Sequence, residues 1–321
     1  MLFRSLAVGL AAAVVLVVSI SSALIYRSWQ QEALAHAEAL QRFNESQAAI
    51  KQLTGISQDL EYFPRLQGVR QNLLEMAAKH YRELHEHRSN DPDMQLATAQ
   101  AMLQLGDVRL LLADHKQAQA AFENAAELAK PLAQTARRKD LKHAANLALI
   151  ASRSKLAECS IHQGEYTAAE ANIAAGLEQA EDSGDQSVLA TRGSLLLQRS
   201  HLQRLQGRWS AAAQDISQAQ ELFERVTSSA RDSTNSELLK DCRINMALSC
   251  DQLALVEEQL GQLERAEQAS QRAIAIWTDL NADAPDVPTY LEGLASSHVL
   301  LGNIQRGFGH DSLRSAQQAI K

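Results

Sequence analysis

The hydrophobic residues of this 321-residue chain follow two different patterns. Residues 5–26, SLAVGLAAAVVLVVSISSALIY, form one unbroken run without a charged residue. After residue 30, the apolar residues recur at helical spacing within polar stretches, and no sustained Val, Ile or Thr alternation predicts a strand. Stretches such as 186–206 and 236–260 contain no proline and are rich in the strong helix formers Ala, Leu, Gln and Glu. The pattern therefore predicts an all-α protein behind one long apolar segment.

The apolar segment has the length and the flanks of a transmembrane helix. A helix over 5–26 would reach about 33 Å, which is enough to cross a hydrocarbon core of about 30 Å. Arg4 precedes the run and Arg27 follows it, while Tyr26 and Trp29 lie where an interfacial aromatic belt would be. We therefore expect a membrane anchor over 5–26, after a short tail of residues 1–4.

The alternative is a signal peptide that is cleaved near Ala23, because Ser21, Ser22 and Ala23 offer small residues at a processing site. The apolar run continues through Leu24 and Ile25, which favours the uncleaved anchor. A very short N-terminal segment is compatible with a cytoplasmic N-terminus, and this topology would place the rest of the chain outside the cytoplasm.

Residues 27–60 read as a polar helix and linker. The stretch QQEALAHAEALQRF carries Leu34, Ala37 and Leu40 on one side, a weak apolar seam. This pattern favours a juxtamembrane spacer helix, with weak self-association through 27–55 as the alternative. From residue 64 to 321, the chain is predicted to form one domain of helical repeats.

The stretch LGDVRLLLADHKQAQAAFENA, residues 105–125, carries the best-formed repeat. Leu105 and Gly106 are followed by Ala118, Phe122 and Ala125 at the spacing of a small-large-small seam. Gly106 and Ala118 would let two antiparallel helices approach closely, with Phe122 as the wedge against the next pair.

The second half of this pattern recurs three times, each time beginning with a glycine. The recurring residues are Gly164, Tyr166, Ala169, Ile173 and Gly176; Gly207, Trp209, Ala212, Ile216 and Ala219; and Gly261, Leu263, Ala266, Ser270 and Ala273. Leu301 and Gly302 repeat the start of the unit, but Arg314 stands where a small residue is expected, so the fifth unit is degenerate or a cap. We interpret these residues as packing residues of the repeats.

These residues resemble the tetratricopeptide repeat family. With units starting near residues 99, 150, 193, 247 and 295, each step exceeds the usual period of about 34 residues, and we expect longer first helices to absorb the surplus. The resemblance implies an α-solenoid, a right-handed superhelix of helical hairpins, with a concave groove lined by the first helix of each unit. Its groove-facing positions are occupied here by Gln100, Gln104, Asp107, Lys155, Glu158, His162, Gln198, His201, Arg204, Asp251, Gln252 and Glu258.

The order of segments also resembles a narrower group. The apolar span, the polar helix and then GISQDLEYFPRLQGVRQNLLEMAAKHYRELHEHRSNDPDMQLATAQAMLQLGD look like the region after the kinase domain in planctomycete-type membrane serine/threonine kinases. The Gly-rich loop, the HRD loop and the DFG motif of a kinase are missing from this chain. The resemblance therefore implies a membrane-tethered repeat module without kinase activity, either a stand-alone relative or a reading frame that starts upstream.

The net charge and the candidate reactive residues exclude several classes of function. A net charge of −7 argues against a nucleic-acid partner. Cys159, Cys242 and Cys250 lack metal or redox spacing, and His80, Glu83 and His87 read as surface residues rather than a metal site. No catalytic or cofactor motif is recognisable, so we expect no enzyme, no cofactor and no metal.

The predicted function is therefore a non-enzymatic, membrane-anchored scaffold that binds a protein or peptide in its groove. The mixed charges of the groove-facing residues do not reproduce the Lys, Asn and Arg set that clamps a C-terminal carboxylate. The alternative function is the sensory or regulatory arm of a bacterial serine/threonine kinase system.

Overall fold

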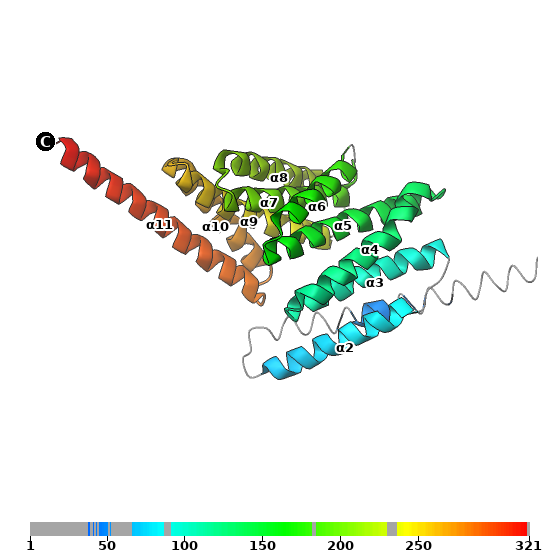
Figure 1. Cartoon of the computed structure of the whole chain (residues 1–321). Coiled ribbons are helices and arrows are strands. Elements are labelled where there is room, and N and C mark those ends of the chain that lie inside the picture. Colours follow the sequence, from blue (N-terminus) through cyan, green and yellow to red (C-terminus); the bar gives the residue numbers. More distant parts are fainter. Residues whose placement is uncertain are drawn as a thin grey trace, which may run out of the picture.

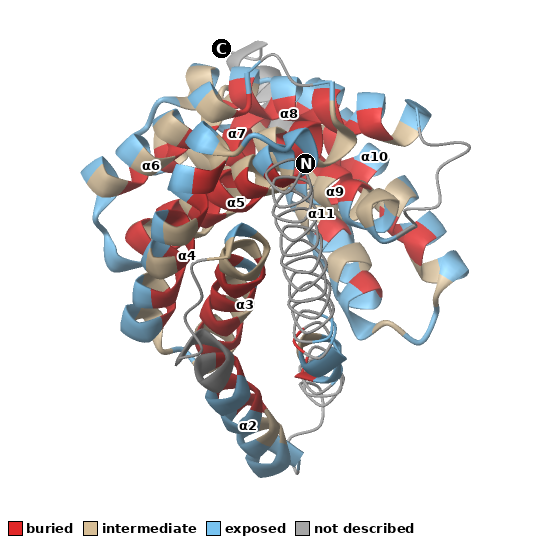
Figure 2. Ribbon diagram, turned by 90° about the vertical axis from the view of Figure 1, so that its right-hand side faces the viewer, coloured by how far each residue is buried: buried red, intermediate tan, exposed pale blue. Residues whose placement is uncertain are grey.

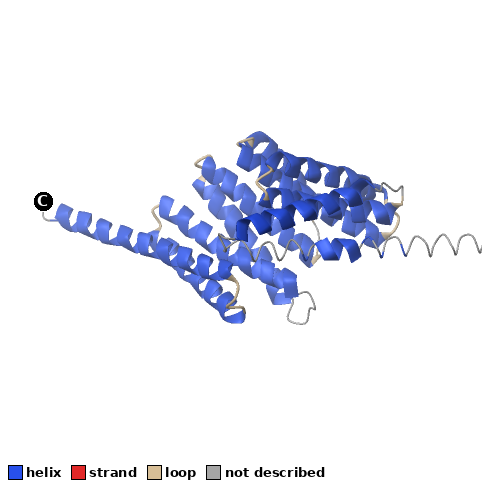
Figure 3. Cartoon of the chain, turned by 90° about the horizontal axis from the view of Figure 1, so that it is seen from below, coloured by secondary structure: helices blue, strands red, loops and turns tan. Residues whose placement is uncertain are grey.

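The computed structural model describes residues 38, 41, 43, 45–50, 52, 66–86, 91–181, 184–229 and 236–319. In these ranges all regular structure is helical, and no strand occurs (Figure 3). The helices are α2 (Gln67–Glu86), α3 (Pro92–Leu111), α4 (His115–Thr135), α5 (Lys139–Gln163), α6 (Tyr166–Gln179), α7 (Gln186–Leu205), α8 (Trp209–Ser229), α9 (Ser236–Gln259), α10 (Leu263–Asp283) and α11 (Pro288–Ala319). The expected all-α chain of helical repeats is confirmed.

The expected anchor over 5–26 lies outside the described residues. Within the described ranges, no helix combines the length and the apolar character that a membrane crossing requires.

Helices α3 to α10 form four antiparallel hairpins that stack along the chain (Figure 1). The first helices of successive hairpins contact one another in the order α3, α5, α7, α9 and α11, while each second helix packs against the first helix that follows it. Figure 2 shows these helices arranged around a curve, with the buried residues where neighbouring helices meet. The first helices contact one another, whereas no comparable contact joins the second helices α4, α6, α8 and α10, so the first helices form the inner side of the curve.

The same backbone conformation closes all four hairpins. Gly164, Gly207 and Gly261 have φ angles of 75°, 73° and 73°, and Ala113 takes the equivalent place in the first hairpin with φ 56°. Left-handed backbone is favourable for glycine and strained for a residue with a Cβ atom. The sequence pattern assigned these glycines to helix packing, but a Cβ built on any of the three meets no atom within 4 Å. They shape the turns instead.

Ala113→Gly should stabilise the protein. The substitution relieves the left-handed strain at the first turn, and we expect the free energy of unfolding to rise by about 0.5 to 1 kcal/mol. Urea denaturation of the variant and of Gly207→Ala, which introduces the same strain into another turn, provides the comparison. A loss of stability in Ala113→Gly would contradict this account of the turns.

The small residues of the repeat pattern are buried where the hairpins close. Ala118, Ala169, Ala212 and Ala266 have no exposed surface, and the same is true of Ala125, Ala219 and Ala273. Phe122 is fully buried against Gly106 of its own hairpin and also packs with Leu156 and Cys159 of α5. The wedge thus joins two successive hairpins, as the spacing predicts.

The extra length of the repeats lies in their helices. Helices α5 with 25 residues and α9 with 24 show the expected extension of first helices. The first helices α3 and α7 have 20 residues, and the second helices α4, α8 and α10 have 21 each, so the surplus is shared between both kinds of helix. The fifth unit differs from a hairpin, because α11 continues as one 32-residue helix through the place where a turn would fall. A Cβ built on Gly302 meets no atom within 4 Å, so this glycine does not mark a close approach between helices.

The segment before α2 packs on the repeats. The described residues between 38 and 52 are helical, and the side chains of Phe43 and Ile50 are buried in one cluster with Leu74, Tyr81 and Met102. Gln47 also donates a hydrogen bond to the Ala97 carbonyl at 3.4 Å. This end of the predicted spacer helix is therefore part of the folded domain rather than a free linker, because its apolar residues are buried together with those of α2 and α3.

Candidate functional site

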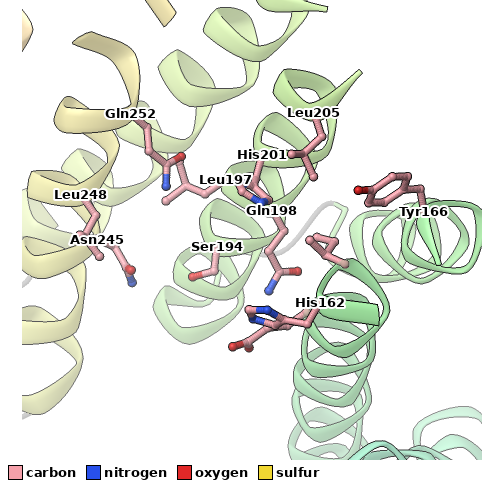
Figure 4. Close-up of a pocket in the computed structure, with 12 residues that line it drawn as sticks. His162, Tyr166, Ser194, Leu197, Gln198, His201, Leu205, Asn245, Leu248 and Gln252 are labelled. Carbon is pink, nitrogen blue, oxygen red and sulfur yellow. The ribbon is translucent and has the colours of Figure 1, made fainter. Parts of the chain in front are cut away.

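A pocket of about 630 Å³ opens on the inner side of the curve, where the first helices of three hairpins meet. Figure 4 shows the side chains that converge on it from α5, α6, α7 and α9. Its lining consists of Glu158, Ile161, His162, Tyr166, Ser194, Leu197, Gln198, His201, Leu205, Asn245, Leu248 and Gln252.

Helix α7 forms the centre of the pocket. Ser194, Gln198, His201 and Leu205 recur every three or four residues and therefore lie along one face of the helix. The opposite side of α7 is held in the core, where Leu189 and Leu196 are buried. Core packing thus fixes the direction in which the pocket residues point.

The rim of the pocket is apolar and accessible. Tyr166, Leu205 and Leu248 expose 40%, 52% and 43% of their surface. These three residues come from three different helices and gather around a single cavity (Figure 4). Scattered exposed leucines are ordinary on a protein surface, but a cluster at a concave site marks a binding surface.

Side-chain amides supply polar groups between the apolar residues. The amide nitrogen of Gln198 donates to the Ser154 hydroxyl at 3.0 Å, while its buried carbonyl oxygen Oε1 has no partner. Gln252 accepts a 3.5 Å hydrogen bond from the Ser200 hydroxyl and keeps its Nε2 donor for other partners. The pocket therefore carries two side-chain amides that the fold positions, and the Gln252 Nε2 remains a donor.

A charged cluster adjoins the pocket on the side of α3. The Lys155 ammonium lies 3.1 Å from Asp107 Oδ1 and 3.3 Å from Glu158 Oε2. Burial lowers the pKa of Lys155, but the carboxylates of Asp107 and Glu158 outweigh this effect and raise it to about 12. Burial raises the pKa of Asp107 despite the nearby ammonium. Glu158, the carboxylate among the lining residues, thus shares the Lys155 ammonium with Asp107.

The two pocket histidines differ in their surroundings. The pKa of His201 is lowered by burial and, to a lesser extent, by the positive charge of Arg204 and by His162. The ring of His162 lies 5.6 Å from the ring of His115, centroid to centroid. At neutral pH the His201 ring is therefore uncharged, because its pKa lies below the ordinary value of about 6.5.

Acid should destabilise the protein partly through His201. Below the ordinary histidine pKa the unfolded chain binds a proton that folded His201 resists, so stability falls as the pH falls. We expect His201→Gln to lose less stability than the unsubstituted protein between about pH 7.5 and about pH 5. Urea denaturation of both proteins at the two pH values measures this difference. Equal losses would show that His201 does not contribute.

The structure brings five of the predicted groove residues together in the pocket: Glu158, His162, Gln198, His201 and Gln252. Asp107 and Lys155 form the adjoining ion pair, whereas Gln100 and Gln104 lie on α3, which does not line the pocket. Arg204 lies between the lining residues His201 and Leu205 on α7 but does not line the pocket itself, and Glu258 follows the lining residues of α9.

Asp251 has a different environment from the other predicted groove residues. Its carboxylate accepts hydrogen bonds from the Ser297 hydroxyl at 2.7 and 2.8 Å and from Trp277 Nε1 at 3.3 Å. These bonds join α9 to α10 and α11, so the Asp251 side chain stabilises the packing of the last helices.

The apolar half of the pocket was not predicted from the sequence. Leu197, Leu205 and Leu248 line it together with Ile161, and Tyr166 was assigned to helix packing although it lies at the rim. The sequence does contain evidence for these apolar residues, because Leu205 follows His201 by four residues and so falls on the same helix face. The groove prediction considered polar residues alone and therefore missed these leucines.

The part of the chain that the structure describes contains no metal-binding arrangement. No group of three or more His, Cys, Asp or Glu residues in that part is placed to hold a metal ion. His87 and the side chain of Glu83 lie outside the described residues. Cys159, Cys242 and Cys250 are free and buried, and burial raises the pKa of each thiol to about 11. Such thiols are poor nucleophiles.

Comparison with known proteins gives one family match. A model of the tetratricopeptide repeat family matches residues 99–131, which run from within α3 into α4. No curated protein matches the chain at a significant level. The match, together with the repeated turns and small residues of the four hairpins, supports a tetratricopeptide repeat protein.

The solved structures that match this chain share little sequence with it. BtubC (BKLC) from P. vanneervenii is 16% identical over 76% of this chain and 89% of its own, with a TM-score of 0.47. The S. pombe nuclear import adaptor Nro1 is 14% identical over 82% of this chain and 88% of its own, with a TM-score of 0.46. The tetratricopeptide repeat protein TTC0263 from Thermus thermophilus is 15% identical over 78% of this chain and 99% of its own, with a TM-score of 0.35.

Proposed function

We propose that this chain is a non-enzymatic scaffold that binds an extended segment of a partner protein in the pocket between α5, α6, α7 and α9. The observation that carries the proposal is the cluster of Tyr166, Leu205 and Leu248, which stay exposed around one cavity. An apolar side chain of the partner would displace water from these three residues and from Leu197.

The polar groups of the pocket favour an extended backbone rather than a small molecule. A peptide unit presents one N–H donor and one C=O acceptor, and the Nε2 of Gln252 offers a donor to the carbonyl. The side chains of Asn245 and Ser194 add polar surface beside them. Apolar anchoring combined with recognition of the main chain is typical of peptide-binding grooves.

Leu248→Asp tests the proposal. A library of random 12-residue peptides displayed on phage is selected against the full chain, and the affinities of the enriched peptides are then measured in solution. We expect Leu248→Asp to weaken binding at least about tenfold, because a carboxylate would be buried in the apolar contact. Val299→Asp is the matched control, since Val299 is equally apolar and 64% exposed but lies on α11. Peptides that bind both variants equally well would refute the site.

The membrane anchor over 5–26 remains part of the proposed function. Its support is the uncharged run between Arg4 and Arg27, with Tyr26 and Trp29 at the expected interface. In this topology the repeat domain faces away from the cytoplasm. Mass spectrometry of the mature protein from membranes should find the residues of 5–26 retained. A mature chain that begins near Ala23 would instead show a secreted protein.

The alternative function is the regulatory arm of a serine/threonine kinase system. It is favoured by the order of segments and by the stretch from residue 55 to 107, which resemble the region that follows the kinase domain in planctomycete-type kinases. Under this alternative, the natural partner in the pocket belongs to the signalling system. Affinity purification from the native membrane should then recover serine/threonine kinase activity, and that activity should be lost with Leu248→Asp. Purification without any kinase would rule out this alternative.

A further inference from the structure

Helix α11 has one apolar side that no other described helix covers. It packs on α10 and α9 through Tyr290 and Ile304, which are buried. The opposite side of α11 carries Leu291, Ala295 and Val299 at intervals of four residues. Leu291 and Val299 expose 51% and 64% of their surface. In Figure 1, α11 is the last helix at this end of the stack, so this side faces away from the repeats.

The first hairpin shows what covers the same side of an equivalent helix. In that hairpin, Ala99 and Leu103 of α3 pack with Ala126 of α4, and Gly106 lies against the ring of Phe122. The residues at the corresponding positions of the last unit are Ala295, Val299 and Gly302. A Cβ built on Gly302 meets no atom within 4 Å. This side of α11 therefore has the residue types of a helix-packing surface, but within the described residues it lacks the second helix.

The charges on this side of α11 are arranged so that it complements a second copy of itself. Glu292 precedes Val299 by seven residues, Arg306 follows it by seven, and both are exposed. Seven residues make about two helical turns, so each charge lies about 10 Å from Val299 along the axis and on the same side. If two such helices cross antiparallel at Val299, each Glu292 lies opposite the Arg306 of the other copy.

Both charged groups can form this contact. Arg306 donates to the Gly302 carbonyl and to Asn303 Oδ1 of its own helix, and both of these acceptors are uncharged. Glu292 already has an interaction within the chain, but a carboxylate has two oxygens and can accept further hydrogen bonds. A guanidinium from a second copy can therefore be added without breaking the existing interaction.

From the apolar side and its charges we infer that two copies of this chain associate through α11, as an antiparallel pair with two-fold symmetry. Val299 of each copy lies at the crossing point, and the small residues Ala295 and Gly302 beside it let the helices approach closely. A pair of Glu292 and Arg306 lies on either side of the crossing. The equal spacing of opposite charges about Val299 favours a second copy over an unrelated helix, because only a matching arrangement pairs both charges.

The association is weak and leaves the pocket accessible. One helix pair is smaller than a standard interface of about 1,600 Å², so we expect a dissociation constant on the order of 10 μM or higher. The chain is then a monomer at the low concentrations of a denaturation experiment. The pocket is lined by α5, α6, α7 and α9 and not by α11, so the inference does not depend on the proposed function.

Val299→Cys in the full chain tests the pairing. The native residues Cys159, Cys242 and Cys250 are buried, so the introduced thiol is the accessible one. On oxidation with copper phenanthroline we expect a disulfide-linked dimer, because the two Cα atoms at the crossing point lie within disulfide reach. Val69→Cys is the matched control, since Val69 is an exposed valine on α2. Its linked fraction should be lower by at least about fivefold.

Two further sets of variants test the direction of the pair and its charges. Leu291→Cys should not form a dimer, because the two thiols of an antiparallel pair would be about 24 Å apart along the axis, whereas a parallel pair would link them. In the Val299→Cys background, Glu292→Arg or Arg306→Glu alone should lower the linked fraction about fivefold, since each change breaks both symmetric ion pairs. The double reversal should restore it.

Three results would overturn the inference and leave the proposed function standing. Equal linking of Val299→Cys and Val69→Cys would show that the dimers form by random collision. Efficient linking of Leu291→Cys would exclude the antiparallel arrangement. A double reversal that stays as poorly linked as the single reversals would show that Glu292 and Arg306 do not pair between copies.

Discussion

Gly106→Val should lower the free energy of unfolding by about 3 kcal/mol. A Cβ built on Gly106 lies 2.2, 2.5 and 2.6 Å from three carbon atoms of the Phe122 ring. The ring has no exposed surface and is enclosed by Leu156 and Cys159 as well. It has no space into which to move, so α3 and α4 would have to separate. Urea denaturation followed by circular dichroism measures the loss.

Two further variants make this prediction specific. Gly302→Val introduces the same side chain into α11, where a Cβ meets no atom within 4 Å, and should change stability by less than about 0.5 kcal/mol. In the Phe122→Ala background, Gly106→Val should be nearly neutral, because the clashing ring is gone. A large loss in that background, or a large loss for Gly302→Val, would contradict the close packing of Gly106 on Phe122.

Trp277→Ala should cost about 3 to 5 kcal/mol and should release α11 from the stack. The indole is fully buried between α9, α10 and α11, and a Cβ on Gly293 would lie 2.5 Å from it. Its ring lies 6.3 Å from that of Tyr290, centroid to centroid, and its Nε1 donates to Asp251. Hydrogen exchange resolved by peptide should therefore show lost protection over residues 288–307, while α3 to α6 stay protected.

Trp277→Phe separates the two contributions of the indole. This variant keeps an aromatic ring against Gly293 but removes the hydrogen bond to Asp251, whose remaining donor is Ser297. We expect a loss of about 1 kcal/mol for the hydrogen bond, with a further small loss from the smaller ring. Full protection of α11 in Trp277→Ala would show that this residue does not hold the last helix.

The positions of the turns and of the buried residues of the repeats could largely be predicted from the sequence, because each unit has the same residue types at these positions. The alanines at 118, 169, 212 and 266 mark where helices meet, and their side chains are buried without exception. The glycines at 164, 207 and 261 were found for the wrong physical reason, since they provide positive φ rather than space. The first turn has Ala113 in place of a glycine, so a search for glycines does not find it, although its backbone has the same conformation.

The limits of the repeat domain were harder to predict. Residues Phe43 and Ile50 belong to a polar stretch that reads as a spacer helix, and only the folded structure shows the surface of α2 and α3 that buries them. The last unit keeps the Leu301 and Gly302 start of a repeat, yet α11 runs on as one helix. Both features, the burial of Phe43 and Ile50 and the unbroken α11, depend on contacts between segments that are distant in the sequence. The spacing of apolar residues within a helix does not predict such contacts.

The pocket was half predictable. Family positions led to Gln198, His201 and Gln252, because the groove side of a first helix follows from its periodicity. Asp251 lies beside Gln252 in the sequence but turns toward Ser297 and Trp277, which come from later helices.

Photo-crosslinking of a selected peptide to the full chain tests the central claim most directly. The peptide carries benzoylphenylalanine in place of its apolar anchor, and mass spectrometry locates the attached residues. We expect cross-links within residues 197–205 of α7 and 245–252 of α9, with none in Leu248→Asp, because these segments enclose the apolar part of the pocket. Cross-links that fall on α8, α10 or α11 and persist in Leu248→Asp would contradict the claim that this pocket is the binding site.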